Sequence, residues 1–123
     1  MSHKNLVIHE TEGKKIPNIR QEAIMMITAE TAGSVNLSFA KVTYRPGDGS
    51  PLHHHDRTEE IYYILSGYGK VVIDDEEFPV RPGHAVLLPV GSIHRILNTG
   101  DQDLVYFCID SPSYEHADTI VES

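Results

Sequence analysis

The sequence has few cysteines and few basic residues, and each scarcity excludes a class of structure or partner. It has a single cysteine, Cys108, so it cannot form a disulfide within the chain, which fits a reducing compartment. Only 10 Lys and Arg residues stand against 18 Asp and Glu residues, and no basic cluster interrupts the resulting net charge of −8. A surface of this sign repels the phosphates of nucleic acids. We therefore expect no nucleic-acid partner.

Long hydrophobic segments are also missing. No apolar run approaches the roughly 18 residues that a membrane-spanning helix needs, and the first residues do not have the pattern of a signal peptide. We therefore expect no membrane partner and a cytoplasmic location. A length of 123 residues with 40% hydrophobic residues suits one domain with a single core.

Short β-prone runs separated by Gly, Pro, Asn and Asp fill most of the chain, which predicts an all-β sandwich or barrel. Residues 21–30 are the one helix-like alternative, but their apolar residues form no 3.6-residue stripe, so we expect a strand there too. The expected strands are 23–28, 35–44, 61–65, 70–74, 78–80, 85–88, 94–97 and 104–109.

The alternating runs divide the chain into three parts. Residues 21–110 form the barrel, and residues 1–20 form an N-terminal arm or edge strand. Residues 111–123 are acidic and lose the alternation, so we expect this C-terminal tail to leave the barrel as a short helix or an extended arm. The strand at 61–65 is apolar on both faces and must be covered twice, which predicts a homodimer.

Four side chains have the types and spacing of a metal site. His53 and His55 point to the same side of a strand while His54 points away, because side chains alternate. Glu60 opens the next β-prone run, and His94 opens another just after a Pro-x-Gly turn. Each histidine alone is more often a surface or core residue, so the prediction depends on their joint spacing. Three imidazoles and one carboxylate suit a divalent transition metal such as Fe, Mn, Ni, Cu or Zn.

The same residues fall into two motifs with regular spacing. The first is made by Gly47, His53, His55, Glu60 and Gly67, and the second by Gly83, Pro89, Gly91, His94 and Asn98. Together they resemble the two motifs of the cupin superfamily, with the short interval typical of small, single-domain bacterial cupins. Glu59 also fits the looser spacing, but the count from Gly67 selects Glu60. This resemblance implies a double-stranded β-helix, or jelly-roll barrel, with the four residues above as metal ligands.

The resemblance also implies an enzyme of the oxygenase, decarboxylase or isomerase type. A divalent ion with one carboxylate carries a local charge of about +1 and attracts an anionic oxygen ligand. Four protein ligands leave coordination positions open, as in catalytic sites. We expect a dioxygenase acting on a small oxygen-bearing anion; the alternatives are a redox-neutral sugar or keto-acid isomerase or decarboxylase, and a non-catalytic binding protein.

Three further residues have open roles. Tyr62 shares a face with Glu60 and is a candidate catalytic residue, or else a core tyrosine with a satisfied hydroxyl. Lys41 lies among apolar neighbours, so it either lines the pocket or extends outward. Cys108 lies in an apolar run and fits a small buried hydrophobe better than a nucleophile.

Overall fold

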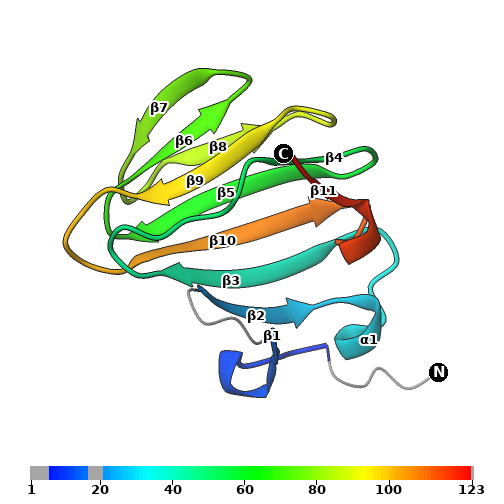
Figure 1. The fold of residues 1–123 in the computed structure, drawn as a ribbon. Coiled ribbons are helices and arrows are strands. Elements are labelled where there is room, and N and C mark those ends of the chain that lie inside the picture. The colour runs from blue at the N-terminus through cyan, green and yellow to red at the C-terminus, as the bar shows by residue number, and fades with distance from the viewer. Residues whose placement is uncertain (1–5, 17–20, 123) are drawn as a thin grey trace.

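The computed structural model describes residues 6–16 and 21–122, and nearly all of its regular structure is β-strand (Figure 1). Inward and outward residues alternate along the strands, as the sequence pattern predicts; Ser38–Tyr44, for example, is buried at every second position. The strands are β1 (Lys14–Ile16), β2 (Gln21–Ile27), β3 (Ser38–Tyr44), β4 (His53–His55), β5 (Glu59–Ser66), β6 (Gly69–Ile73), β7 (Glu76–Val80), β8 (Ala85–Leu88), β9 (His94–Asn98), β10 (Leu104–Ser111) and β11 (Thr119–Val121). The helical turns are η1 (Glu10–Glu12), α1 (Ala29–Ala32) and η2 (His116–Asp118).

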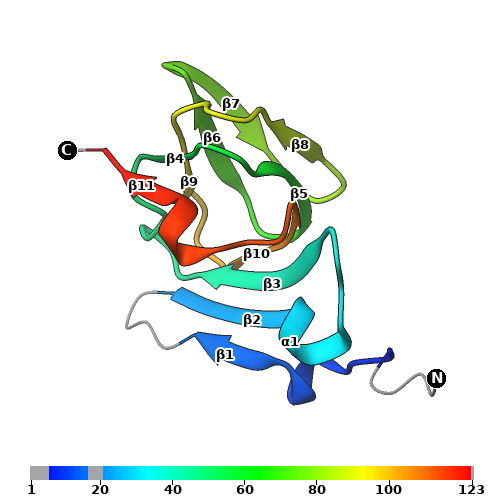
Figure 2. The same ribbon diagram turned by 90° about the vertical axis from the view of Figure 1, so that its right-hand side faces the viewer.

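The strands form two antiparallel sheets that enclose the core (Figure 2). One sheet has six strands in the order β1-β2-β3-β10-β5-β8, and the other has five in the order β11-β4-β9-β6-β7. From β3 to β11 the chain crosses from one sheet to the other at each step except at the β6–β7 hairpin. This connectivity confirms the predicted all-β jelly-roll barrel.

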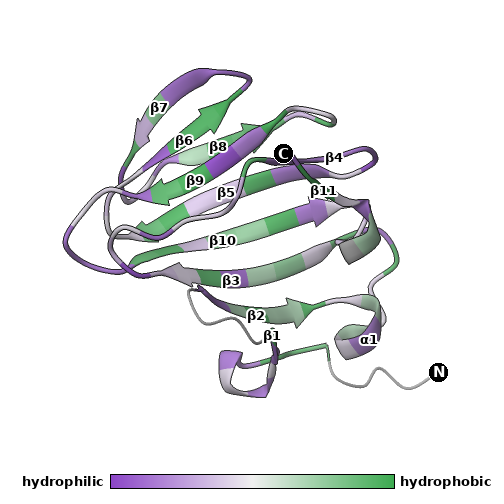
Figure 3. Cartoon of the chain, viewed as in Figure 1, coloured by the Kyte–Doolittle hydropathy of each residue, from purple (hydrophilic) through white to green (hydrophobic). Residues whose placement is uncertain are grey.

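Large apolar side chains from both sheets meet between them. Ile64 of β5, Val71 of β6, Ile96 of β9 and Leu104 of β10 are fully buried. Hydrophobic residues are interspersed with hydrophilic ones along the strands of both sheets (Figure 3). Burial of this alternating set removes apolar surface from water and holds the two sheets together.

The N-terminal half follows the predicted strands with small shifts. The helix-like segment at 21–30 is mainly strand, β2, and only the four-residue helix α1 follows it. The strand expected at 35–44 begins three residues late, at Ser38, because Ser34 and Leu37 bond to each other in a turn and Val35 is exposed. Within the predicted N-terminal arm, β1 pairs with β2 at the sheet edge; residues 1–5 and 17–20 lie outside the described residues.

The C-terminal tail differs from the prediction that it leaves the barrel. After η2 it returns to the second sheet, where β11 pairs antiparallel with β4. Its three strand residues are too few to show an alternating pattern, and the pairing depends on an edge that β4 offers more than 60 residues earlier. Among the described residues, no helix has the length and apolar character needed to cross a membrane.

Candidate metal centre

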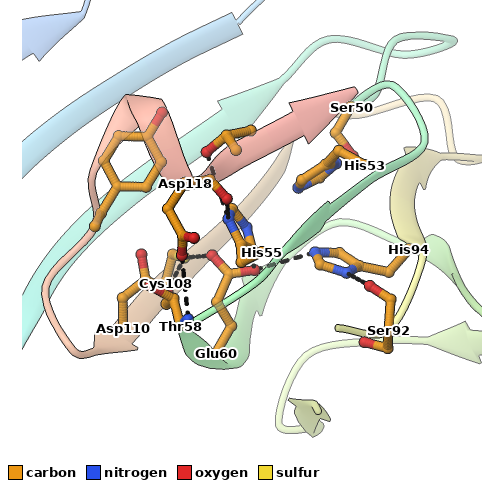
Figure 4. A network of polar contacts seen from close by, with 12 residues as sticks. Ser50, His53, His55, Thr58, Glu60, Ser92, His94, Cys108, Asp110 and Asp118 are labelled. Atoms are coloured by element: carbon orange, nitrogen blue, oxygen red, sulfur yellow. Dashed lines mark hydrogen bonds and ion pairs between the residues drawn. The ribbon is translucent and has the colours of Figure 1, made fainter. Parts of the chain in front are cut away.

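The four predicted ligands come together inside the barrel (Figure 4). His53 and His55 are the two inward residues of the three-residue strand β4, and His53 is paired in register with His94 of β9. Glu60 enters from β5 in the opposite sheet. All four residues are buried, and one ligand atom from each lies within 4.8 Å of the others.

Backbone carbonyls fix the tautomer of all three imidazoles. Each ring donates its Nδ1–H to a carbonyl oxygen, which can only accept, so Nε2 has a free electron pair whenever the ring is neutral. Such hydrogen bonds orient metal-binding histidines in proteins generally. The bonds run from His53 to Pro51 (2.7 Å), from His94 to Ser92 (3.0 Å) and from His55 to Asp118 (3.2 Å).

The resulting cluster of donor atoms fits a divalent cation. Glu60 Oε1 lies 3.1 Å from His94 Nε2 and 3.5 Å from His55 Nε2. His55 Nε2 is buried and makes no hydrogen bond. With Nδ1 carrying the hydrogen, these nitrogens present electron pairs to a carboxylate oxygen, which is unfavourable without a cation between them. His53, His55, Glu60 and His94 would therefore hold a divalent transition metal; the chemistry of the set accepts several ions.

Burial and mutual charge act differently on these groups. Burial lowers the pKa of His53, and the neighbouring His94 acts in the same direction. For His55, burial opposes protonation, but the proximity and charge of the Glu60 carboxylate outweigh it and raise the pKa. Burial likewise disfavours the Glu60 carboxylate, yet its imidazole partners hold the pKa well below the usual value. In the metal-free protein near neutral pH, His53 is therefore neutral and Glu60 is ionised, while His55 binds a proton more readily than a free imidazole does.

Metal binding should therefore release protons. Because the pKa of His55 is raised, metal-free protein holds a proton there at pH values where a free imidazole has lost it. We expect each ion to displace about one proton as the pH falls from about 8 to 6, so that affinity weakens about tenfold per pH unit at the acidic end. Calorimetric titrations in two buffers of different ionisation enthalpy measure this release. A pH-independent affinity over that range would contradict the assignment of His55 as a ligand.

Two residues of β10, Cys108 and Asp110, lie beside Glu60, and the sequence predicted this contact for neither. The Cys108 thiol donates to Glu60 Oε2 at 3.2 Å, so its surroundings are more polar than those of a simple buried hydrophobe. Burial raises the pKa of Asp110 to about 9, and the charge of Glu60 adds to the rise, so Asp110 is neutral and hydrogen-bonds to Glu60. Period-two alternation from Tyr106 places both on the inner face of β10, but the predicted strand ended at Ile109.

Tyr62 lies next to the ligands, as its position on the face of Glu60 predicts. Its side chain is buried, and its hydroxyl is 3.4 Å from Glu60 Oε1. Burial, and then the charge of Glu60, raise the pKa of Tyr62 well above its usual value, so the hydroxyl remains a hydrogen-bond donor.

Lys41, by contrast, extends outward, where Nζ lies 2.6 Å from Glu10 Oε2 of η1. His54 also faces away, toward Asp56 and Glu122.

A cavity of about 320 Å³ borders the cluster. It reaches from the ligands to the strands β1 and β2 at the edge of the larger sheet, and the C-terminal segment forms part of its wall. Its lining residues include His53, His55 and Glu60, the tyrosines Tyr44, Tyr62, Tyr106 and Tyr114, and the apolar Ile16, Ala23, Met25, Val42 and Val121. The site thus combines a metal-binding end with a largely apolar and aromatic body, a composition suited to a small organic ligand.

Known proteins resemble this chain over most of its length. An uncharacterised protein of Methanocaldococcus jannaschii is 39% identical over 85 residues, which are 69% of this chain and 68% of that protein. An oxalate-binding protein of Thermotoga maritima is 30% identical over 105 residues, covering 81% of this chain and 87% of its own length. The crystal structure of a predicted oxalate decarboxylase from the same organism superimposes with a TM-score of 0.76 at 28% identity, covering 87% of this chain and 99% of that one.

The match to a family model includes every proposed ligand. The model described as the cupin domain matches residues 40–110, a range that runs from within β3 to nearly the end of β10 and contains both glycine-histidine motifs. This range is more than half of the chain. Together with the jelly-roll topology and the buried ligand cluster, it shows that the chain belongs to the cupin family as a small single-domain member.

Proposed function

We propose that this cupin is a metal-dependent enzyme for a small, oxygen-bearing anionic substrate. The observation that carries the proposal is the cluster of four buried ligand atoms within 4.8 Å, bordered by a cavity. A divalent transition metal bound there supplies Lewis acidity toward a substrate oxygen and, if it is redox-active, a means of using dioxygen. The oxalate-binding relative, at 30% identity, supports an anionic ligand.

Dioxygenation is the reaction we propose first, since four protein donors leave the ion room for further ligands. A carboxylate, phenolate or enolate oxygen would be drawn to the metal end, and the tyrosines of the cavity would contact an organic body. Oxygen consumption with a panel of catechols and β-diketones tests this. Consumption that requires both substrate and metal supports it, whereas none across the panel with fully loaded protein contradicts it.

A redox-neutral reaction is the second candidate, and the likeness to a predicted oxalate decarboxylase at 28% identity favours it. The neutral Asp110 beside Glu60 offers a proton source that such a reaction needs. Release of carbon dioxide from oxalate or keto acids under anaerobic conditions distinguishes this candidate from the first. Tight binding of these ligands without turnover in either assay would instead indicate a binding protein.

Tyr62 is proposed to orient the substrate through its hydroxyl. We expect Tyr62→Phe to bind metal within about threefold of the wild type and to lower turnover about 100-fold, because a positioned proton donor contributes that order. Tyr106→Phe is the matched control, because both tyrosines are 3% exposed and both line the cavity, but only Tyr62 bonds to Glu60. Equal turnover in the two variants would assign Tyr62 a packing role only.

We also propose a cytoplasmic homodimer. Ile61 and Tyr63 of β5 and Leu87 of β8 are 40, 42 and 53% exposed on the outer face of the larger sheet, next to the paired rings of Phe39 and Phe107. A second copy would cover this apolar face. Light scattering should give twice the 13.7 kDa of the chain, and Tyr63→Glu should halve the measured mass. A monomeric wild type would contradict the proposal.

A further inference from the structure

The C-terminal segment 112–122, which we call the clasp, packs along the strand that carries two of the four ligands and along the loop that leads from that strand to a third. We propose that the clasp is part of the metal centre and that Asp118 is the positioning residue that holds His55 and Glu60 in place. This inference rests on the proposed metal centre. It goes beyond the residues that any family motif contains, since the match to the cupin model ends at residue 110.

The Asp118 carboxylate fixes the loop between two ligands. It accepts three backbone N–H bonds of 3.2 Å, one at Oδ1 from Asp56 and two at Oδ2 from Arg57 and Thr58. These are consecutive residues of the four-residue link from His55 to Glu60. Hydrogen bonds to a charged acceptor are about twice as strong as neutral ones. A single side chain therefore sets the path by which the chain passes from one ligand to the next (Figure 4).

The carbonyl of the same residue orients the ligand itself. Asp118 O accepts the His55 Nδ1–H at 3.2 Å, and the Thr119 hydroxyl lies 3.4 Å from the same nitrogen. His53 and His94 donate the equivalent bond to carbonyls only two residues earlier in the chain, Pro51 and Ser92, just before their strands begin. Of the three ligand imidazoles, only His55 depends on a carbonyl that is 63 residues away in the sequence.

Further contacts tie the clasp to the barrel at several points. Thr119 and Val121 of β11 pair in register with His55 and His53 of β4. Beyond the strand, the Glu122 N–H donates to Leu52 O at 2.9 Å. At its start, Pro112 O accepts from the Thr58 hydroxyl at 3.3 Å. These contacts set the position of the clasp, and the Asp118 contacts transmit that position to the ligands.

The Tyr114 ring lies edge-on to His55, with ring centroids 6.4 Å apart, and Tyr114, Thr119 and Val121 line the cavity. The clasp therefore contacts the ligand shell and the space for substrate together. If the clasp had only a structural role, substitutions that disrupt it would lower the stability of metal-free and metal-loaded protein alike. A clasp that positions ligands changes metal affinity specifically and acts more on His55 than on His53 or His94.

The test compares Asp118→Ala with Glu115→Ala in the untagged full chain. Glu115 lies in the same segment with an exposed side chain, so its variant controls for change in the tail. Affinity for Co²⁺ is measured by competition with a chromophoric chelator. We expect the wild type and Glu115→Ala to agree within about threefold and Asp118→Ala to bind 10- to 100-fold more weakly, the usual loss when an outer partner of a metal ligand is removed.

A second measurement reads the individual imidazoles. In Co²⁺-loaded protein, each ligand histidine gives a paramagnetically shifted, exchangeable Nδ1–H signal. At saturating Co²⁺, we expect Asp118→Ala to broaden one of three such signals, that of His55, through faster exchange with water. His55→Ala identifies it in the wild-type spectrum by its absence. Parallel broadening of all three signals would show a general structural effect and overturn the proposal.

Asp118→Asn keeps one acceptor oxygen but loses the charge, and we expect an intermediate affinity. It replaces Asp118→Ala in both measurements if that variant does not fold. If the folded Asp118 variant binds Co²⁺ as tightly as the wild type, the positioning role is overturned and the metal centre stands. Absence of Co²⁺ binding by the wild type overturns the metal centre itself, so the two failures are distinguishable.

Discussion

We expect His94→Ala to bind divalent transition metals at least about 100-fold more weakly than the wild type. His94 is 1% exposed, and its Nε2 lies 3.1 Å from Glu60 Oε1 at the centre of the ligand cluster. Loss of an outer partner already costs 10- to 100-fold in affinity, and loss of the ligand itself should cost at least as much. Competition with a chelator over Zn²⁺ measures the change, and metal-dependent turnover should fall to the background rate.

His54→Ala is the control for this substitution. His54 adjoins both β4 ligands, but its ring faces away and lies 3.2 Å from Asp56 and 3.4 Å from Glu122. We expect its affinity for Zn²⁺ to stay within about threefold of the wild type, because the ligand cluster is untouched. Equal losses in the two variants would mean that the histidine-rich strand binds metal without the predicted geometry.

Gly67→Ala should be among the most destabilising single substitutions in the chain. Gly67 has a φ of +83°, where a side chain is strained, and a β-carbon there would overlap the carbonyl oxygen of Asp103 and lie 2.9 Å from Leu104 Cα. Both obstacles are backbone atoms beside a fully buried core residue, Leu104, so relief requires the sheet to shift. We expect a loss of more than about 3 kcal/mol in the free energy of unfolding. Chemical denaturation monitored by circular dichroism measures it.

Gly83→Ala separates the cost of backbone strain at a positive φ from the cost of overlap with neighbouring backbone atoms. Gly83 belongs to the second motif and has a φ of +96°, but a β-carbon there would meet no atom within 4 Å. Its substitution should therefore cost only the backbone strain, about 1 kcal/mol. If Gly67→Ala cost no more than Gly83→Ala, the close approach of Gly67 to the 103–104 backbone would not limit the fold.

The grouping of the four candidate ligands could be predicted from the sequence because local geometry decides which side chains point inward. In a strand, His53 and His55 must share a face and His54 must oppose them, and the structure shows this burial pattern. The same alternation on β5 places Glu60 inward, while Glu59 is exposed. The predicted strands of the barrel also followed from alternation and turn residues, whereas the jelly-roll class was implied by the resemblance to cupins.

The surroundings of the ligands could not be predicted in the same way. Asp118 reaches the metal centre through bonds that span 60 to 63 residues, from a segment without any alternating pattern. Such contacts depend on tertiary packing, and no local rule specifies them. The inward position of Asp110 could have been predicted from alternation, since it follows Tyr106 and Cys108 at intervals of two. An acidic residue buried at the end of an apolar strand is not expected from hydrophobicity, and its neutral state depends first on burial and then on the charge of Glu60.

The direction of the Lys41 side chain likewise could not be predicted from local rules. Alternation on β3 assigns it to the face opposite Ala40 and Val42, but it does not say which face borders the cavity. The position of η1, whose Glu10 pairs with Lys41 at 2.6 Å, decides that the lysine extends outward. The role of Tyr62 remains a prediction, although its hydroxyl lies beside Glu60 as the sequence indicated.

The metal content of the untagged chain tests the central claim most directly. Protein purified without a histidine tag and dialysed against metal-free buffer is analysed by elemental mass spectrometry, together with His55→Ala prepared in the same way. The four-ligand centre predicts about one divalent transition metal per wild-type chain and almost none in the variant. Full metal retention by His55→Ala, or a metal-free wild type that cannot be loaded, would contradict it.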